Sequence, residues 1–387
     1  MEKTKVMMIS AQNFLYKSDS GGSQASRRNY ELLMRIFNKE NMLVLQMVDE
    51  IYEDISGVHV KQILIKNTFI HKYLTMLFLR NRYSKRNERD IQKYINEEKP
   101  DIVFFDGTAF GYIAKMFSQA TLKIAFYHNI EKHYAIQRKN PMRIIQFFST
   151  WMNERYITKC ADIRICLNQR DDRLLYKSYH VHSDYLLPIT FDDIGEESIN
   201  KEVNEKNVLL FVGSYFTPNI RGIKWFCKYV MPRVNQQLLI VGKGMEHLKG
   251  KLEGPKVKVI GGVNSLQNYY NIASAVVMPI FIGDGMKVKT AEAFMYGKTV
   301  FATNEALEGY DVKGIEGIHI CNTAEEFINS LNNEHRYGFR QEVRDAFLDR
   351  YCTRAWENVF SDYLAEKIES WEKKNENDRK KGIQDQS

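Results

Sequence analysis

Short apolar runs alternate with helical stretches along the whole chain, and this alternation limits the fold more than any other sequence feature. The runs are rich in Val, Ile and Leu and too short for buried helices, which is typical of strands covered on both faces in a parallel sheet. They lie at 6–9, 42–48, 58–65, 101–105, 123–127 and 163–167, and then at 207–213, 238–241, 257–260, 276–280, 299–303 and 318–321. We therefore expect an α/β protein built on doubly wound parallel sheets.

One polar, acidic segment, residues 191–206, interrupts the alternation and predicts a boundary between two domains of similar size. Ligands of such sheets bind at the carboxyl ends of the strands, so we expect a binding cleft between the two domains. The expected parts are an N-terminal Rossmann-like, acceptor-binding domain over 1–192, a linker over 193–206, a C-terminal Rossmann-like, donor-binding domain over 207–355, an amphipathic crossover helix over 356–374 that packs on the first domain, and a disordered tail over 375–387.

Composition narrows the class of protein. The 387 residues are 44% hydrophobic, but no apolar run reaches the roughly 18 residues that a membrane-spanning helix needs. The N-terminus lacks the long apolar core of a signal peptide. The five cysteines show no CxxC spacing and do not cluster with histidines, which predicts reduced thiols and no metal site. We therefore expect a cytoplasmic protein.

Residues 61–93 carry nine basic side chains against two acidic ones, together with many large apolar residues. A basic, partly apolar helical stretch can lie on an anionic membrane, so a peripheral position at the inner face of the plasma membrane is one expectation. The alternative is a helix packed on the core with a solvated polar end. No nucleic-acid-binding module is recognisable, so we expect no nucleic-acid partner.

The segment 279–297 carries the strongest functional signal. An apolar strand leads into Gly283-Asp284-Gly285 and then into a helix, which leaves the unpaired N–H groups and the positive end of the helix dipole open to an anion. Lys287 and Lys289 add charge, and Glu292 shares a helix face with Lys289. This pattern predicts a diphosphate on the loop and sugar hydroxyls at the carboxylate, as in a nucleotide-sugar site. The alternative is a capped helix whose lysines are solvated.

The chain resembles the two-domain, GT-B fold retaining glycosyltransferases of family 4, the group 1 glycosyl transferases. The resemblance is most specific between residues 208 and 310. It includes 209–214 (LLFVGS), 240–244 (IVGKG), 259–263 (VIGGV), Pro279, 283–292, Gly297 and Glu308-Gly309. The first domain matches more loosely, through Gly21-Gly22, His128-Asn129, Glu154-Arg155 and Ala161-Asp162. The implied architecture is two Rossmann-like domains facing across a cleft, with a C-terminal helix crossing back.

The resemblance also implies roles for single residues. The catalytic set would be His128, near the anomeric carbon, Asp284, on a hydroxyl of the transferred sugar, and Glu292, on the ribose hydroxyls. Asp284 stands where many members have Glu, which leaves the sugar open. Donor contacts would come from Gly22, Ser214, Arg221, Gly261, Val263, Gly285, Met286, Lys287, Val288, Lys289 and Glu292, and acceptor contacts from Gly21, Asp106 and Asn129.

Ser214 and Arg221 occupy the positions at which the family commonly has two phosphate-binding cations. One cation is therefore missing, and we expect Lys287 or, preferably, Lys289 to replace it. The expected reaction moves a sugar from a UDP- or GDP-sugar to a hydroxyl of a glycan or lipid-linked acceptor with retention, without metal or cofactor, in capsule, exopolysaccharide or O-antigen assembly. In such a front-side displacement the leaving phosphate helps to deprotonate the acceptor.

Two alternatives stay open at this point: a non-catalytic binding partner with the same fold, and a sugar-nucleotide epimerase. A nicotinamide-dependent oxidoreductase is disfavoured, because the candidate fingerprint at Gly242-Lys-Gly244 lacks the third small residue.

Overall fold

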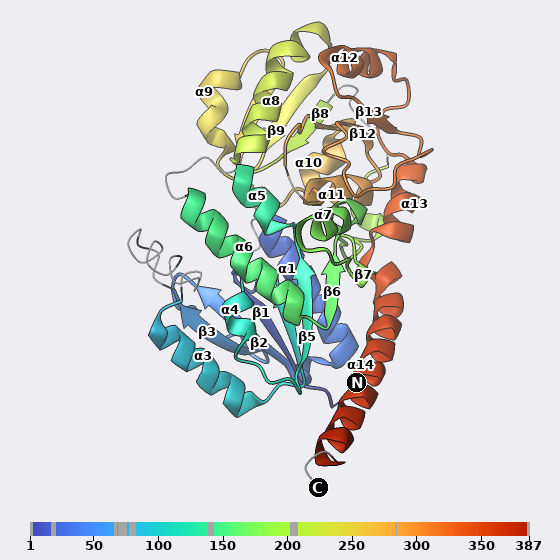
Figure 1. Ribbon diagram of the computed structural model, residues 1–387. Coiled ribbons are helices and arrows are strands. Elements are labelled where there is room, and N and C mark those ends of the chain that lie inside the picture. Colours follow the sequence, from blue (N-terminus) through green and yellow to red (C-terminus); the bar gives the residue numbers. More distant parts are fainter. Residues whose placement is uncertain are drawn as a thin grey trace. The chain divides into compact units, whose positions relative to one another are not determined.

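The computed structural model describes residues 3–16, 21–65, 68, 76, 83–137, 143–201, 208–283 and 285–384 (Figure 1). The chain divides into two compact units. The first contains the N-terminal strand, Gly22–Leu187 and the C-terminal segment from Trp356, and the second contains Pro188–Ala355. Each unit has one parallel β-sheet, as the alternating sequence pattern predicts.

The first unit has a seven-stranded sheet in the order β3-β2-β1-β4-β5-β6-β7. Its strands are β1 Val6–Ser10, β2 Met42–Val48, β3 His59–Leu64, β4 Ile102–Asp106, β5 Leu122–Tyr127, β6 Ile163–Cys166 and β7 Tyr185–Leu186. Its helices before the C-terminal segment are α1 Gly21–Phe37, α3 Lys85–Glu98, α4 Gly111–Ala114, α5 Glu131–Gln137, α6 Arg143–Cys160 and α7 Gln169–Tyr179, with a 3-10 turn at Lys39–Asn41. All strand pairs in this sheet are parallel.

Burial explains why the apolar runs form the centre of this sheet. Every residue of β1, β2, β4 and β5 is buried, because helices cover both faces. On one face, Met7, Phe105 and Tyr127 pack with Ile91 of α3 and Ile157 of α6. Two buried polar residues, Ser10 and Asp106, end strands β1 and β4, and the carboxyl ends of the strands are where a ligand site is expected in such a sheet.

The second unit has a six-stranded parallel sheet in the order β10-β9-β8-β11-β12-β13. Its strands are β8 Val208–Val212, β9 Gln237–Val241, β10 Val257–Gly261, β11 Ala275–Met278, β12 Thr299–Ala302 and β13 Ile318–Ile320. Its helices are α8 Thr217–Tyr229, α9 Lys249–Leu252, α10 Gln267–Ile272, α11 Val288–Met295, α12 Ala324–Asn333 and α13 Gln341–Arg350, with 3-10 turns at Glu196–Ser198, Met231–Arg233 and Met245–Leu248.

Helix α14, Thr353–Gln384, carries the chain back to the first unit, as predicted (Figure 1, red). The ring of Tyr363 stacks on Tyr185 of β7 with 4.3 Å between centroids, and Phe360 and Leu364 are buried. The expected disordered tail from residue 375 differs from the structure, in which the helix continues to Gln384.

The acidic segment after residue 191 packs on the second unit instead of forming a separate linker. Arg344 of α13 is fully buried, and its guanidinium binds Asp193 at 2.6 Å and Glu196 at 3.2 Å. Ile199 is also buried. The acidic residues that suggested a solvated linker are therefore partners of a buried cation, at least as far as residue 201. Residues 202–207 lie outside the described part.

The basic stretch 61–93 is described only at 61–65, 68, 76 and 83–93, so most of the helix expected there lies outside the described residues. The described ends belong to β3 and α3. In the part of the chain that the structure describes, no helix combines the length and the apolar content that crossing a membrane requires.

Candidate functional site

The glycine loop of the second unit lies between β11 and α11, as the sequence predicts. Gly285 has φ of 63°, a left-handed conformation that favours glycine. Lys287 is the N-cap of α11, and its side chain makes no capping hydrogen bond. The following amides, beginning with Val288, therefore keep the polarity that attracts an anion. Met286 is buried, and Asp284 lies outside the described residues.

Glu292 is the most heavily engaged carboxylate of this region. The residue is only 8% exposed, although it carries a charge. Lys289 Nζ donates to both of its oxygens at 2.7 and 2.8 Å, and Tyr270 Oη donates to Oε2 at 3.2 Å. Tyr270 stacks on Tyr296 with 4.5 Å between the ring centroids. Burial, and then the charge of Glu292, raise the pKa of Tyr270 well above its ordinary value, so its hydroxyl stays a donor.

Both lysines of the loop and helix already have protein partners. Lys287 Nζ donates to Glu305 Oε1 at 2.7 Å and to the Gly285 carbonyl at 2.9 Å. The 3-residue spacing of Lys289 and Glu292 allowed their pairing to be anticipated. The position of Glu305, which follows β12, could not be anticipated from spacing. Any anion bound here must therefore compete with a carboxylate for each ammonium group.

The remaining donor candidates lie at the carboxyl ends of neighbouring strands. Ser214 follows β8 and Arg221 lies on α8, and both are exposed. Gly261 ends β10 with φ of 87°, and a Cβ atom there would lie 2.7 Å from Glu246 Oε2. Val263 is half-buried two residues further. Because β8 lies between β9 and β11 and β10 follows β9 in the sheet, these groups share one edge with the glycine loop.

In the first unit, polar side chains from three neighbouring strands meet in register. Ser10 ends β1 and pairs with Gln46 of β2 on one side and with Asp106 of β4 on the other. Asp106 in turn pairs with Phe126 of β5, two residues before His128. Because side chains alternate along a strand, His128 lies on the same face as Phe126 and therefore above Asp106.

The buried carboxylate of Asp106 orients the ring of His128. Its Oδ1 accepts from His128 Nε2 and from Asn29 Nδ2, both at 2.8 Å, and its Oδ2 accepts from Ser10 Oγ at 2.8 Å. Burial raises the pKa of Asp106, but the charge and hydrogen bond of His128 and the hydrogen bond of Asn29 outweigh this and hold it below its ordinary value. An ionised carboxylate only accepts, so Nε2 carries a proton, and in the neutral form of the ring Nδ1 presents a lone pair. The His128 side chain is 22% exposed.

The first-unit candidates for the acceptor have different surroundings. Gly21 is the exposed first residue of α1, and Gly22 lies against the side-chain amide of Gln12. Asn129 keeps its buried Oδ1 without a hydrogen-bond partner among the described residues. Asp106 was expected to contact the acceptor, but its oxygens are occupied by the three donors above. Asp106 is thus buried beneath His128, and its contact with the acceptor stays a prediction.

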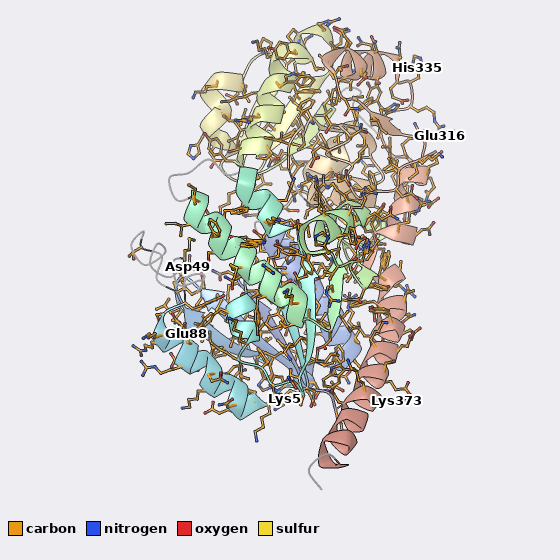
Figure 2. The ribbon with its side chains drawn as sticks, in the orientation of Figure 1. Lys5, Asp49, Glu88, Glu316, His335 and Lys373 are labelled. Carbon is orange, nitrogen blue, oxygen red and sulfur yellow. The ribbon has the colours of Figure 1, made fainter. Side chains whose placement is uncertain are left out.

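The loop that carries His128 is held by a residue to which the sequence assigned no role. Glu154 of α6 is fully buried, and its carboxylate accepts from the backbone N–H groups of Glu131 and Lys132 at 2.8 and 2.9 Å. It also accepts from Tyr179 Oη at 2.7 Å. These bonds fix the start of α5, three residues after His128. Surface carboxylates such as Glu316 extend into solvent instead (Figure 2).

Three comparisons find known proteins that are similar to this chain. Residues 206–333 match the family model described as Glycosyl transferases group 1. A curated relative, the lipopolysaccharide 1,2-N-acetylglucosaminetransferase of Salmonella typhimurium, is 24% identical over 161 residues, which cover 36% of this chain and 41% of that relative. The match thus spans less than half of the relative's length.

Solved structures extend the likeness to both units. The sucrose-phosphate synthase of Thermosynechococcus elongatus has a TM-score of 0.71 at 15% identity, over 95% of this chain and all of that one. Anabaena HepE, solved in complex with UDP and glucose, has a TM-score of 0.64 at 13% identity, over 94% of this chain and all of that one. At such identities the likeness establishes the fold, which is that of the GT-B glycosyltransferases, two parallel-sheet α/β domains.

Proposed function

We propose that this chain, which belongs through residues 206–333 to the group 1 glycosyl transferases, moves a sugar from a nucleoside diphosphate sugar to a hydroxyl of a glycan or lipid-linked acceptor. One observation carries the proposal. A nearly buried carboxylate, Glu292, lies one turn into the helix that follows the glycine loop, held by Lys289 and Tyr270. This is the arrangement that a nucleotide needs, with pentose hydroxyls at the carboxylate and phosphates at the helix start.

Glu292 has the remaining capacity to bind a ribose. An ionised carboxylate offers about four lone-pair sites. Lys289 and Tyr270 use three of them in the ligand-free protein, and the side chain is 10% exposed. A ribose hydroxyl can take the free site on Oε1, and further sites open as Lys289 turns toward a phosphate. Donor binding would then exchange one ion pair for another and leave no buried charge unpaired.

The diphosphate would be bound by backbone amides of Gly285, Met286, Lys287 and Val288, with Ser214, Arg221 and Lys289 beside them. Departure of the nucleoside diphosphate builds negative charge, and preorganised donors of this kind contribute the largest catalytic effect in many enzymes. A diphosphate held in this way needs no metal ion. UDP is the first nucleotide to test, because Anabaena HepE was solved in complex with UDP and glucose.

In the first unit, His128 would assist at the sugar. Its Nδ1 lone pair can accept a hydrogen bond from a sugar hydroxyl while Asp106 holds Nε2. Two buried carboxylates of this unit, Asp106 and Glu154, are engaged by hydrogen-bond donors and are therefore not available as nucleophiles. This supports a front-side displacement with retention, in which the leaving phosphate receives the acceptor proton.

A membrane-bound acceptor is supported by the surface of α6. Four apolar side chains recur every four residues on its exposed side, with exposed fractions of 73% for Ile144, 53% for Phe148, 37% for Met152 and 36% for Tyr156. Lys115, Arg155 and Lys159 lie exposed on or beside this stripe. An apolar stripe flanked by cations suits an anionic bilayer. Helix α6 would thus face the membrane, with or without a contribution from residues 66–82. The acceptor would be a lipid-linked precursor of a surface polysaccharide.

Sedimentation with vesicles tests the membrane partner. Anionic phosphatidylglycerol vesicles should carry the protein down more than neutral phosphatidylcholine vesicles, and Phe148→Ser should weaken this. Equal sedimentation with both lipids would contradict it, and so would a stable dimer in light scattering that Phe148→Ser dissolves.

A donor screen tests the function itself. Thermal unfolding is measured with a panel of UDP-, GDP- and dTDP-sugars, because a ligand specific to the folded state raises the Tm. We expect one donor to stabilise the protein and to release nucleotide when acceptor is supplied, and Glu292→Ala to lower turnover about 100-fold. No stabilisation by any donor would contradict the proposal. Binding without turnover would indicate a non-catalytic partner, and nucleotide release without acceptor an epimerase.

A further inference from the structure

Arg28 of α1 is a buried cation without a partner. The residue is 5% exposed, and its Nε, Nη1 and Nη2 atoms are all buried without a hydrogen bond among the described residues. A guanidinium carries five N–H donors, and leaving them unsatisfied away from water costs free energy. Burial lowers its pKa to about 10, against the opposite effect of Asp106, so the group is charged at neutral pH.

The contacts that Arg28 does make place it at the polar end of the first sheet. Its Cζ lies 5.5 Å from the centre of the Phe126 ring. Phe126 in turn packs edge-on against His128, with 4.9 Å between the ring centroids. The ring of Phe126 therefore lies between Arg28 and His128, the partly exposed residue that we place at the reacting sugar.

Other unsatisfied polar atoms accompany it. Asn29 Oδ1, Gln46 Oε1 and Asn129 Oδ1 are buried without hydrogen-bond partners in the described part of the chain. Gln46 lies in β2, two residues before the strand ends, and Asn129 follows β5. Asn29 is bonded to Asp106 at the end of β4. Buried polar groups are otherwise paired in folded proteins, so a group of unpaired ones at the ligand edge of a sheet indicates that a partner is missing.

Against the effect of burial, the negative charge of Asp106 raises the pKa of Arg28. Among the described residues, however, the two side chains form no ion pair, because Asp106 binds Ser10, Asn29 and His128. We propose that Arg28 binds an oxyanion, a carboxylate or a phosphate, that the substrate brings to the carboxyl end of the first sheet. The planar fork of a guanidinium fits both groups with two parallel hydrogen bonds. The proposal depends on the proposed function, because that function is what brings a sugar or a sugar acceptor to the first unit.

Two sources share this chemistry: an acidic sugar with a carboxylate, and the phosphate of a lipid-linked acceptor. Sodium glucuronate and inorganic phosphate serve as separate probes in thermal unfolding of the full chain. We expect one of them to raise the Tm of the wild-type protein and to lose this effect in Arg28→Met, with part of it kept in Arg28→Lys. Glucuronate alone would identify an acidic sugar, and phosphate alone a phosphorylated acceptor.

Two matched controls separate this site from others. Arg27 is the neighbouring arginine, but its Nη2 donates to the Phe14 carbonyl at 2.9 Å, so Arg27→Met should keep the response to the probe. Lys289→Met lies in the second unit and should keep the response to glucuronate, which carries no phosphate. UDP binding, which tests the proposed function, should be unchanged in Arg28→Met, so failure of one proposal is visible apart from the other.

Stability without ligand gives the second readout. An unpaired buried charge opposes folding, so Arg28→Met should unfold at the same or a higher urea concentration than the wild-type protein. A structural counter-ion for Asp106 would behave in the opposite way, and Arg28→Met would then be less stable or fail to fold. That result, or the absence of any Tm shift with both probes in the wild-type protein, would overturn the proposal.

Discussion

Lys289 donates hydrogen bonds to both carboxylate oxygens of Glu292, three residues further along α11, at 2.7 and 2.8 Å. The pair is electrically neutral before a ligand arrives. In the proposed donor complex, a diphosphate would attract an ammonium that a carboxylate already holds, and the ribose would take over the carboxylate. This exchange predicts that the two side chains contribute to different parts of the nucleotide.

Lys289→Met should weaken the binding of UDP by about tenfold, because a charge-assisted hydrogen bond contributes roughly 1.5–3 kcal/mol. Binding of uridine, which has no phosphate, should change much less, since Tyr270 still holds Glu292. Isothermal titration calorimetry with UDP and uridine measures both. Lys289→Arg, which keeps the charge, is the control. An equal loss for UDP and uridine would show that Lys289 does not contact the phosphates.

Asp106→Asn should lower kcat by about 100-fold or more while leaving the KM for the donor nearly unchanged, because an uncharged amide can also donate to Nε2 and no longer fixes the proton of His128 there. The effect should not add to that of His128→Ala, since the two side chains act as a unit. Ser10→Ala removes another bond to Asp106 without touching His128 and should have a small effect. Full additivity of Asp106→Asn and His128→Ala would mean that the two act separately.

Asp106 also predicts a dependence of stability on pH. Its pKa is lowered in the folded protein, so the stabilisation that it contributes is fully present above the unfolded value of about 3.9 and is lost as pH falls through the folded value. The free energy of unfolding of Asp106→Asn should consequently fall less steeply than that of the wild-type protein below pH 4. Parallel acid profiles from urea titrations would contradict this.

Lys298 should destabilise the second unit at neutral pH. Its Nζ is buried without a hydrogen-bond partner among the described residues, and burial lowers its pKa to about 8. The folded protein releases this proton near pH 8 and the unfolded chain near pH 10.5, so the free energy of unfolding should rise between these values. Lys298→Met should remove the rise and add about 3 kcal/mol at pH 7.

Urea unfolding at pH 7, 8, 9 and 10 measures this change. Lys258→Met, at an exposed position of β10, is the control and should keep the wild-type profile. If Lys298→Met and the wild-type protein show the same pH profile, the ammonium group of Lys298 is solvated in the folded state.

The sheets could be predicted because nearly every central strand is an uninterrupted apolar run. The edge strand β7 was not predicted, because its two residues, Tyr185 and Leu186, carry no periodic signal. The segment 193–201 could not be assigned correctly because its acidic residues have the composition of a linker. Their buried partner, Arg344, is about 150 residues away in sequence.

The candidate site was predictable where spacing on one element decides the contact, as for Lys289 and Glu292. It was not predictable where the register between strands decides. Asp106 meets His128 because β4 and β5 pair in parallel with Asp106 opposite Phe126, and no local pattern encodes this offset. Arg28 was missed for a similar reason: in sequence it is one of two adjacent arginines on an amphipathic helix, and only packing shows that it is buried.

The central claim is that Glu292 binds the pentose of a nucleotide. Calorimetry with UDP and 2′-deoxy-UDP, or with the corresponding guanosine nucleotides if GDP stabilises the protein more, tests it in a cycle with Glu292→Gln. The account predicts that the wild-type protein binds the deoxy compound about tenfold more weakly, and that Glu292→Gln binds both nucleotides equally and weakly. If Glu292→Gln binds UDP as tightly as the wild-type protein does and still distinguishes the deoxy compound, Glu292 does not bind the pentose.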